Sequence, residues 1–495
     1  MQTPATDLPQ LINITAVAGK IFIDGEWVVG EGGSIPSIEP ATGEVLAQVG
    51  IAGAADVSRA AKSAAVAQQE WAALPHPARA AVLRRAGALW EQHAEEIGGW
   101  NVREVGAIPA LAGFALHVSA AECYEAAALP SAPLGTMLSS EEPRLSLAER
   151  VPVGVVGVIS PFNVPLILGI RAVAPALALG NAVLLKPDPR TTITGGIAMV
   201  RIFEEAGLPK GLLQLVPGGA EVGEALVTHP LVRVIAFTGS TRAGRSVGEL
   251  AGRYLKRAHL ELGGNSAFIV REDADVDQAV NLATWGSFLH QGQICMTVGR
   301  HIVHESRFDE YVEKLAAKAD SMFVGDPAVG QVHLGPLIDE TQRDRVHALV
   351  EEAVAQGAIL AAGGTFEGLF YRPTVLSRPP RTAKAYCDEV FGPVASVVSY
   401  STDEEAVDFA SDTEYGLSLG IVSRDALGAL ELARKIPSGI VHINDQTVND
   451  EANTPFGGVG SSGTGSRHGG LDANIDAFTE TRWITMRREP GQYPL

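Results

Sequence analysis

The sequence predicts an α/β protein built around a doubly wound sheet of parallel strands. Apolar strand patterns alternate with helix patterns through the middle of the chain, and Gly-rich turns follow several of the strands. In sheets of this kind, ligands bind at the carboxyl ends of the strands. The 495 residues, 46% of them apolar, can bury a large core, and length alone suggests about three domains.

The alternation begins in an apolar stretch at 151–185, whose only charged residue is Arg171. Prolines interrupt this stretch four times, which excludes one continuous membrane-spanning helix. A buried βαβ unit fits the pattern better. We expect a strand at 153–160, a loop at 161–165, a helix at 166–179 and a strand at 182–186.

The same rhythm continues downstream, with a helix at 192–206, a strand at 212–216, a helix at 220–228, a strand at 232–238 and a helix at 241–252. The segment 259–270 interrupts the rhythm and is predicted to be a boundary. A second α/β segment follows from Asp275, with helices near 275–290, 306–320 and 340–356 and strands near 395–400 and 420–422. The N-terminal part is expected to be largely helical, with helices at 58–69 and 78–97.

A Gly/Ser-rich stretch at 454–470 is either a linker or a shaped loop. Because Pro455, Phe456 and Arg467 interrupt the small residues, the pattern favours a shaped loop. The net charge of −19 argues against a nucleic-acid or anionic-membrane partner, since both attract basic surfaces. The chain begins without a basic segment followed by an apolar one, so we expect no secretory signal and a cytoplasmic protein.

The chain has three cysteines, which do not form a disulfide framework. Cys295 lies among glycine and polar residues, as in a turn, where it is either a nucleophile or a buried inert thiol. Cys123 and Cys387 are expected to be inert. No metal site is expected.

Three further residues have a chemical and a plain structural interpretation. Glu261, between two leucines and before a Gly pair, is a general base or an ion-paired surface carboxylate. Asn163, between two prolines, is an oxyanion donor or a turn residue. Lys186, at a strand end, is a ribose or phosphate ligand or a solvated lysine. The turns at 218–219 and 239–240 admit a pyrophosphate or are ordinary turns.

Taken together, seven short motifs make a specific pattern. They are PFN (161–163), LLKP (184–187), FTGS (237–240), ELGG (261–264), GQICM (292–296), EVFGP (389–393) and PFGG (455–458). In this order they resemble the NAD(P)-dependent aldehyde dehydrogenase superfamily across essentially the whole chain. The segments PFNVPL, LKPDPRT and INDQTVNDE are most similar to the bacterial benzaldehyde and vanillin dehydrogenase branch.

The resemblance implies a covalent mechanism. Cys295 matches the nucleophile that forms a thiohemiacetal and then a thioester. The Asn163 amide and the backbone N–H of Cys295 match the oxyanion donors, and Glu261 matches the base that activates water for hydrolysis. The implied product is a carboxylic acid.

The resemblance also implies NAD+ as cofactor, with NADP+ plausible. The cofactor-binding residues would be Ser160, Pro161, Phe162, Lys186, Gly219, Phe237, Gly239, Ser240, Leu262, Glu389 and Phe391. Many NAD-preferring relatives carry a glutamate three positions after this lysine, where this chain has Pro189. The carboxylate that repels a 2′-phosphate is therefore missing unless Asp188 replaces it, and we expect NADP+ to be less strongly excluded than usual.

For the architecture, the resemblance implies a Rossmann-type cofactor domain, an α/β catalytic domain and a small β oligomerisation arm that makes a homodimer or homotetramer. The expected ranges are 1–131 and 151–260 for the NAD(P)-binding domain, 261–453 for the catalytic domain, 132–150 and 476–495 for the arm, and 454–475 for a Gly-rich return segment.

The expected substrate is an aromatic aldehyde similar to benzaldehyde, with Phe162, Leu166 and Phe288 lining an apolar tunnel. Arg171 would contradict this expectation if it pointed into the tunnel. The alternatives are vanillin, a semialdehyde or an aliphatic aldehyde. A CoA-acylating enzyme and a non-catalytic relative with a dead site are opposed by Glu261 and by the intact catalytic set.

Overall fold

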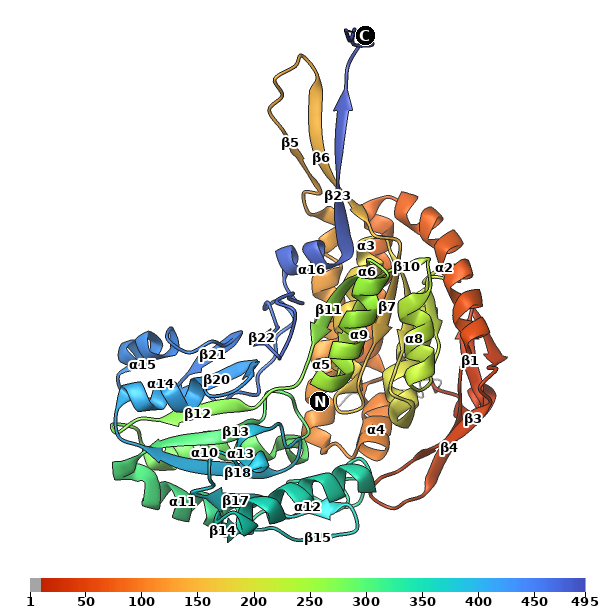
Figure 1. Ribbon diagram of the computed structural model, residues 1–495. Coiled ribbons are helices and arrows are strands. Elements are labelled where there is room, and N and C mark those ends of the chain that lie inside the picture. Colours follow the sequence, from red (N-terminus) through yellow and green to blue (C-terminus); the bar gives the residue numbers. More distant parts are fainter. Residues whose placement is uncertain (1–9, 495) are drawn as a thin grey trace, which may run out of the picture.

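Two seven-stranded sheets, each packed between helices, and a projecting three-stranded arm make up the computed structural model, which describes residues 10–494 (Figure 1). The predicted α/β fold class is confirmed. The sheets lie side by side in the view, and the arm extends from the end of the first sheet. None of the helices in the described part of the chain has the length and apolar character that a membrane span requires.

The first sheet has the strand order β11-β10-β7-β8-β9-β1-β2. Its parallel strands are β7 (Val155–Ile159), β8 (Ala182–Lys186), β9 (Leu213–Leu215), β10 (Val232–Thr238) and β11 (Arg257–Glu261). Every residue of β7 and β8 is buried, as a strand covered by helices on both faces requires. The register pairs Ile159 with Lys186 and Thr238 with Glu261, so several predicted site residues share one sheet edge.

The helices around this sheet are α2 (Ala54–Ala73), α3 (His76–Gln92), α4 (Ala94–Val105), α5 (Pro109–Ala126), α6 (Pro165–Ala178), α7 (Ala198–Glu205), α8 (Ala220–Thr228) and α9 (Thr241–Arg253). The single helix expected at 78–97 is two helices that meet at His93. The helix expected at 192–206 begins as a π-helical turn, Ile193–Ile197. The buried Glu104 carboxylate accepts hydrogen bonds from the backbone N–H groups of Ile193 (2.9 Å) and Thr194 (2.7 Å) there.

The expectation of a largely helical N-terminal part is wrong for residues 20–50. Four strands lie there: β1 (Lys20–Ile23), β2 (Glu26–Val29), β3 (Ser34–Ile38) and β4 (Val45–Gly50), after the short helix α1 (Ile14–Val17). Strands β1 and β2 extend the first sheet with antiparallel pairing, and β3 pairs with β4 in a separate hairpin. Short strands at a sheet edge carry little periodicity, because only part of each face is covered.

The second sheet has the order β14-β17-β18-β13-β12-β20-β21. Its strands are β12 (Ser266–Val270), β13 (Val298–His304), β14 (Ile359–Ala362), β17 (Thr374–Ser377), β18 (Val394–Tyr400), β20 (Ser418–Val422) and β21 (Ile440–Ile443). Helices α10 (Val276–Phe288), α11 (Glu305–Asp320), α12 (Glu340–Ala355), α13 (Lys384–Cys387), α14 (Asp403–Ser411) and α15 (Ala426–Ala433) accompany it. The chain passes from the first sheet to the second between Glu261 and Ser266, inside the segment that interrupts the sequence rhythm.

The Gly/Ser-rich stretch is a shaped loop, as its sequence favours. Its strand β22 (Val459–Gly460) pairs with β19 (Tyr415–Gly416), and β-bridges join Gly463 to Glu261 and Phe456 to His468. Helix α16 (Leu471–Phe478) then leads into β23 (Thr479–Met486). That strand pairs along its length with β6 (Leu145–Pro152), which also pairs with β5 (Gly135–Met137), and these three strands form the arm.

Candidate active site

The candidate active site lies between the two sheets' strand ends, around a cavity of about 300 Å³. Asn163 contributes from the loop after β7, and Cys295 from the loop between a 3-10 turn at Leu289–Gly292 and β13. Glu261, the last residue of β11, is placed by the bridge to Gly463. The sites predicted from separate sequence motifs therefore meet in one region.

The loop before Cys295 is held in a strained conformation. His290 (φ 54°) and Gln291 (φ 57°) both adopt the left-handed backbone region that non-glycine residues rarely occupy. His290 Nε2 donates to the Asn163 carbonyl oxygen at 2.7 Å, and Asn163 Nδ2 donates back to the Gln293 carbonyl oxygen at 2.7 Å. These bonds tie the cysteine loop to the asparagine loop. Residues 290 and 291 are missed by sequence reasoning, because nothing in their types signals strain.

Two groups near the Cys295 thiol each have an N–H that makes no hydrogen bond within residues 10–494. The Asn163 side-chain amide has two N–H donors and spends one on Gln293. Within residues 10–494, the backbone N–H of Cys295 donates to no protein acceptor. Both groups therefore remain able to donate to an oxyanion that develops beside the thiol.

The Cys295 thiol is half-buried on the cavity wall. Burial is the main reason that the pKa of this thiol is raised to about 12. The negative charges of Glu389 and Glu261 raise the pKa further, and the positive charge of Arg171 lowers it. The thiol is therefore neutral at pH 7 in this state and needs a base or a positive charge to become a nucleophile.

Glu261 is well suited to act as a general base. Its side chain is 3% exposed, and within the described residues neither carboxylate oxygen has a hydrogen-bond partner. Burial raises its pKa to about 8, against the opposing positive charges of Arg171 and Arg467. A carboxylate with a pKa near neutrality can both take and release a proton at working pH.

The two glycines of ELGG have a packing reason. A β-carbon on Gly264 would overlap the Cys295 carbonyl oxygen, and one on Gly263 would overlap the Glu389 carboxylate. The Gly264 N–H also donates to Glu389 Oε1 at 3.0 Å. Burial raises the pKa of Glu389 to about 7. Glycine at 264 is needed for the Glu261 loop to pack on the backbone of the Cys295 loop, whereas a side chain at 263 would have to displace the movable Glu389 carboxylate.

Arg171 does line the cavity, but its charge is already paired. It forms ion pairs with Asp450 and, at 3.6 Å, with Glu122, and its guanidinium lies 4.2 Å from the centre of the Phe456 ring. Burial raises the pKa of Glu122 to about 8 and also raises that of Asp450. Sequence reasoning misses Glu122, because α5 also contains Glu125 and the residue types do not show which of the two acids is buried.

The residues predicted to hold a dinucleotide gather at the carboxyl edge of the first sheet. Lys186 is 8% exposed at the end of β8, and beside it the buried Ser160 hydroxyl has no partner among residues 10–494. Gly239 packs under the Phe237 ring, since a β-carbon there would lie 2.7 Å from Phe237 Cζ, and Ser240 caps α9 by accepting from Ala243 N (3.3 Å). An orphaned hydroxyl and a buried ammonium at a strand edge fit a ribose and phosphate ligand.

The other predicted cofactor residues flank this edge. Phe162 packs edge-on against Phe391 at 5.9 Å between ring centroids, and Phe391 has a left-handed backbone (φ 55°). The Leu262 side chain packs closely against Gly244 of α9. Pro161 lies in the loop after β7. Gly219 precedes α8 as its N-cap residue.

The predicted tunnel residues are wrong. Leu166 and Phe288 are 0% exposed in the two hydrophobic cores, and Phe162 faces Phe391 and Arg190 instead of the cavity. For Leu166 and Phe288, which lie in α6 and α10, the reason is that neighbouring helix residues point about 100° apart, so Ile167 and Leu168 line the cavity and Leu166 does not. The apolar lining is Ala110, Leu111, Phe114, Val164, Ile167, Leu168, Trp285, Leu289, Ile294, Met296, Val448 and Phe456.

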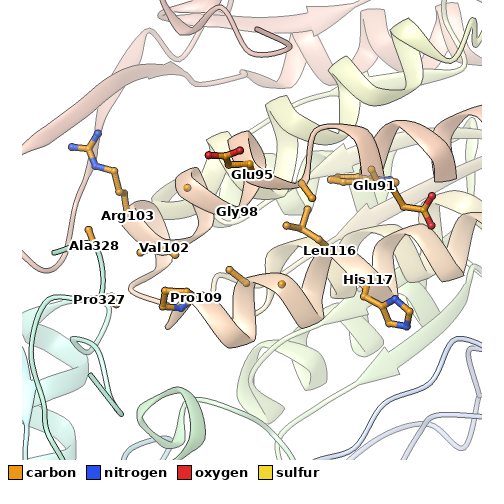
Figure 2. A pocket seen from close by; sticks show the side chains of 15 residues that line it. Glu91, Glu95, Gly98, Val102, Arg103, Pro109, Leu116, His117, Pro327 and Ala328 are labelled. Atoms are coloured by element: carbon orange, nitrogen blue, oxygen red, sulfur yellow. The ribbon is translucent and has the colours of Figure 1, made fainter. Parts of the chain in front are cut away.

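A larger cavity of about 790 Å³ lies elsewhere, on the other face of α5 (Figure 2). Gly98, Val102 and Arg103 of α4 face Pro109, Leu116 and His117 of α5 across it, and Pro327 and Ala328 close one end. It contains none of the predicted catalytic residues. Cys123 is fully buried beneath this region, and burial raises its pKa, whereas Cys387 is half-buried beside Asp388.

Comparison with known proteins identifies the class. Residues 27–484 match the model of the aldehyde dehydrogenase family. The chain therefore belongs to the aldehyde dehydrogenase family, and the resemblance carried by its motifs is confirmed.

Individual relatives cover nearly the whole chain. A vanillin dehydrogenase of Amycolatopsis sp. is 62% identical over 476 residues, which are 96% of this chain and 98% of the relative. A benzaldehyde dehydrogenase [NAD(+)] of Pseudomonas putida is 47% identical over 477 residues, with the same coverage of 96% and 98%. A betaine aldehyde dehydrogenase of Staphylococcus aureus, solved in complex with NAD+, is 29% identical, with a TM-score of 0.93 over 97% of this chain and 96% of that chain.

Proposed function

We propose that this enzyme oxidises an aromatic aldehyde to the carboxylic acid with NAD(P)+, through a thiohemiacetal and a thioester on Cys295. The observation that carries the proposal is the cavity, in which a mostly apolar wall, with Arg171, Gln446, Asn449 and Asp450 among its lining residues, surrounds Cys295 and Asn163. Its volume of about 300 Å³ suits a single aromatic ring with small substituents. Phe114 and Trp285, both partly exposed, supply flat surfaces on which such a ring can pack.

The roles of the catalytic residues follow from their surroundings. The Cys295 thiol gives its proton to solvent water, and the resulting thiolate attacks the aldehyde carbon. The Asn163 amide and the Cys295 backbone N–H donate to the resulting oxyanion, each worth about 3–4 kcal/mol in the transition state. Loss of hydride from the thiohemiacetal leaves the thioester. Glu261 then takes a proton from water, which attacks the thioester and releases the acid.

The nicotinamide cofactor supplies the hydride acceptor when it is bound. Lys186 and Ser160 would hold its adenosine ribose and phosphate region, and the turn at Phe237, Gly239 and Ser240 would lie under the pyrophosphate. Glu389 and Phe391 would position the nicotinamide ribose. We propose NAD+ as the preferred form and NADP+ as a weaker one.

The substrate is tested by comparing aldehydes. The relatives named above are a vanillin and a benzaldehyde dehydrogenase. We expect kcat/KM for benzaldehyde and vanillin to exceed that for hexanal by at least about tenfold, because a flat ring fills the cavity better. NADH or NADPH formation is measured for each aldehyde with each nucleotide. A preference for hexanal would contradict the aromatic assignment.

The nucleophile is tested by Cys295→Ala, which should abolish NADH formation from benzaldehyde. The matched control is Cys387→Ala, a half-buried cysteine outside the cavity, which should retain activity. Persistent activity of Cys295→Ala would show that another residue is the nucleophile.

The same assay tests the two alternative functions. A CoA-acylating reaction is excluded if the yield of NADH is the same with and without CoA. A non-catalytic protein is excluded if the wild type turns over any aldehyde.

We also propose the assembly and location. The apolar face of the arm, with Met137 (76% exposed) and Met486 (62% exposed), would pack on a neighbouring subunit in a homodimer or homotetramer. The proposed division into cofactor domain, catalytic domain and arm follows the two sheets and the arm. A nucleophilic thiol requires a reducing compartment, which favours the cytoplasm.

A further inference from the structure

The resemblance implies that Pro189 stands where many NAD-preferring relatives carry a glutamate that binds the ribose 2′-hydroxyl, so the nucleotide preference of this chain is open. Lys186 marks that region. Its side chain is 8% exposed and runs along the first turns of α8, since a β-carbon on Gly223 would lie 3.7 Å from Lys186 Cε. A residue that discriminates the two nucleotides must therefore lie near Lys186 and the start of α8.

Two carboxylates act on Lys186 from this region. Burial lowers the lysine pKa, and the negative charges of Asp188 and Glu221 both raise it. Asp188 is already engaged by Arg190, from which it accepts at the backbone N (3.0 Å), Nε (2.9 Å) and Nη2 (2.8 Å). Its charge is neutralised by that fork, so Asp188 does not replace the missing glutamate.

Glu221 has no such cation. It is exposed in the first turn of α8, and its Oε1 accepts from the Gly219 N–H at 3.1 Å. A β-carbon on Gly219 would lie 2.6 Å from Glu221 Oε2, so the carboxylate folds closely over the start of the helix. From there its negative charge acts on Lys186.

We propose that Glu221, whose negative charge acts on Lys186, reads the 2′ position of the cofactor's adenosine ribose. A 2′-hydroxyl can donate to the carboxylate, as NAD+ requires. A 2′-phosphate would bring negative charge against it, and the cost would be moderated by Lys186 and by the positive end of α8. This inference rests on the proposed function, because it concerns the nucleotide that the enzyme binds.

The test measures nucleotide binding without aldehyde. Dissociation constants of NAD+ and NADP+ are measured by calorimetry for the wild type, Glu221→Gln and the control Glu224→Gln, which removes the same charge from another position on the same helix. We expect the ratio Kd(NADP+)/Kd(NAD+) to fall about tenfold in Glu221→Gln and to change less than about twofold in Glu224→Gln. In about 1 M salt the wild-type ratio should approach that of the variant.

An unchanged ratio in Glu221→Gln, or an equal change in the control, would overturn the assignment of Glu221 while leaving the proposed function standing. A wild type that binds neither nucleotide would overturn both. Because Glu221 is exposed, the variant should unfold at the wild-type temperature, and Glu221→Lys provides a second variant in which NADP+ should bind more tightly than NAD+.

Discussion

At the scale of single residues, the site gathers buried carboxyls whose pKa values are raised. Glu261 has no protein partner for either oxygen within the described chain, whereas Glu122 and Asp450 share Arg171. The same physical cause, burial, raises the pKa in each case, but the consequences differ. The unpaired group is free to exchange protons with a substrate, and the paired groups hold the cavity wall.

Glu261→Gln should separate the two halves of the reaction. Turnover should fall by about 10²–10⁴-fold, because the amide cannot take a proton from water. A pre-steady-state burst of NADH, measured by stopped-flow absorbance, should persist if the thiolate can still form. Loss of the burst as well would assign Glu261 to activation of Cys295 in addition to hydrolysis.

The pH dependence of turnover should report the same group. A base works when it is deprotonated, so kcat should rise with pH towards a plateau above about 8, the raised pKa of Glu261. Steady-state rates between about pH 6 and 9.5 with saturating substrate measure this. A flat wild-type profile would contradict the role of Glu261 in the slow step.

Glu122→Gln should change the pH dependence of stability. The pKa of Glu122 is raised by burial from its ordinary value of 4.5 to about 8 in the folded state, so folding takes up a proton between these values. The stability that this group contributes is therefore present below about pH 4.5 and is lost as pH rises to about 8, at up to about 1.4 kcal/mol per pH unit.

The measurement is the melting temperature at about pH 5, 7 and 8.5. The variant should gain stability relative to the wild type as pH rises, with no further gain above about pH 8. Glu125→Gln, an exposed acid on the same helix, should show no such trend. A difference that is constant across pH would contradict the raised pKa of Glu122.

At the scale of elements, close approach of loops is what assembles the site. The ELGG turn, the cysteine loop and the EVFGP segment touch through Gly263 and Gly264. The sequence predicted α8 and β10 residue for residue, because Gly and Pro delimit clear apolar patterns there. It missed the break at His93 and the strained turn at His290, since both depend on tertiary contacts.

Gly264→Ala should reduce kcat/KM by about 100-fold, because the new methyl group must displace the Cys295 carbonyl and misplace the thiol. The control is Gly99→Ala, where a β-carbon meets nothing within 4 Å and the helix should gain about 0.5–1 kcal/mol. Steady-state kinetics and thermal melting are measured for both. Wild-type kinetics in Gly264→Ala would show that the cysteine loop moves without cost.

At the scale of the whole molecule, the arm leaves an apolar surface without a cover in one chain. Register places Met137 beside Leu147, and Leu147 beside Ile484, while Leu145 pairs with Met486. These side chains share one face because successive residues of a strand alternate. A projecting sheet with one apolar face is favourable only if another surface buries that face.

Met486→Asp should weaken self-association, because a charge would be buried in the subunit contact. Light scattering coupled to size exclusion should give a smaller mass for the variant at micromolar concentration than for the wild type. The control is Thr485→Asp, an exposed position on the opposite face of the same strand, which should leave the mass unchanged. A monomeric wild type would contradict the proposed assembly.

The sequence by itself determined the family and the alternating α/β architecture, because these depend on local periodicity and on short motifs, and the same motifs are the basis for the proposed catalytic set. Only the tertiary structure decided which side chains line the cavity, that Asp188 is neutralised by Arg190, and that Arg171 is paired inside the wall. The physical reason is that side-chain direction and charge pairing depend on partners distant in sequence, up to 279 residues apart for Arg171 and Asp450. Local patterns carry no information about such partners.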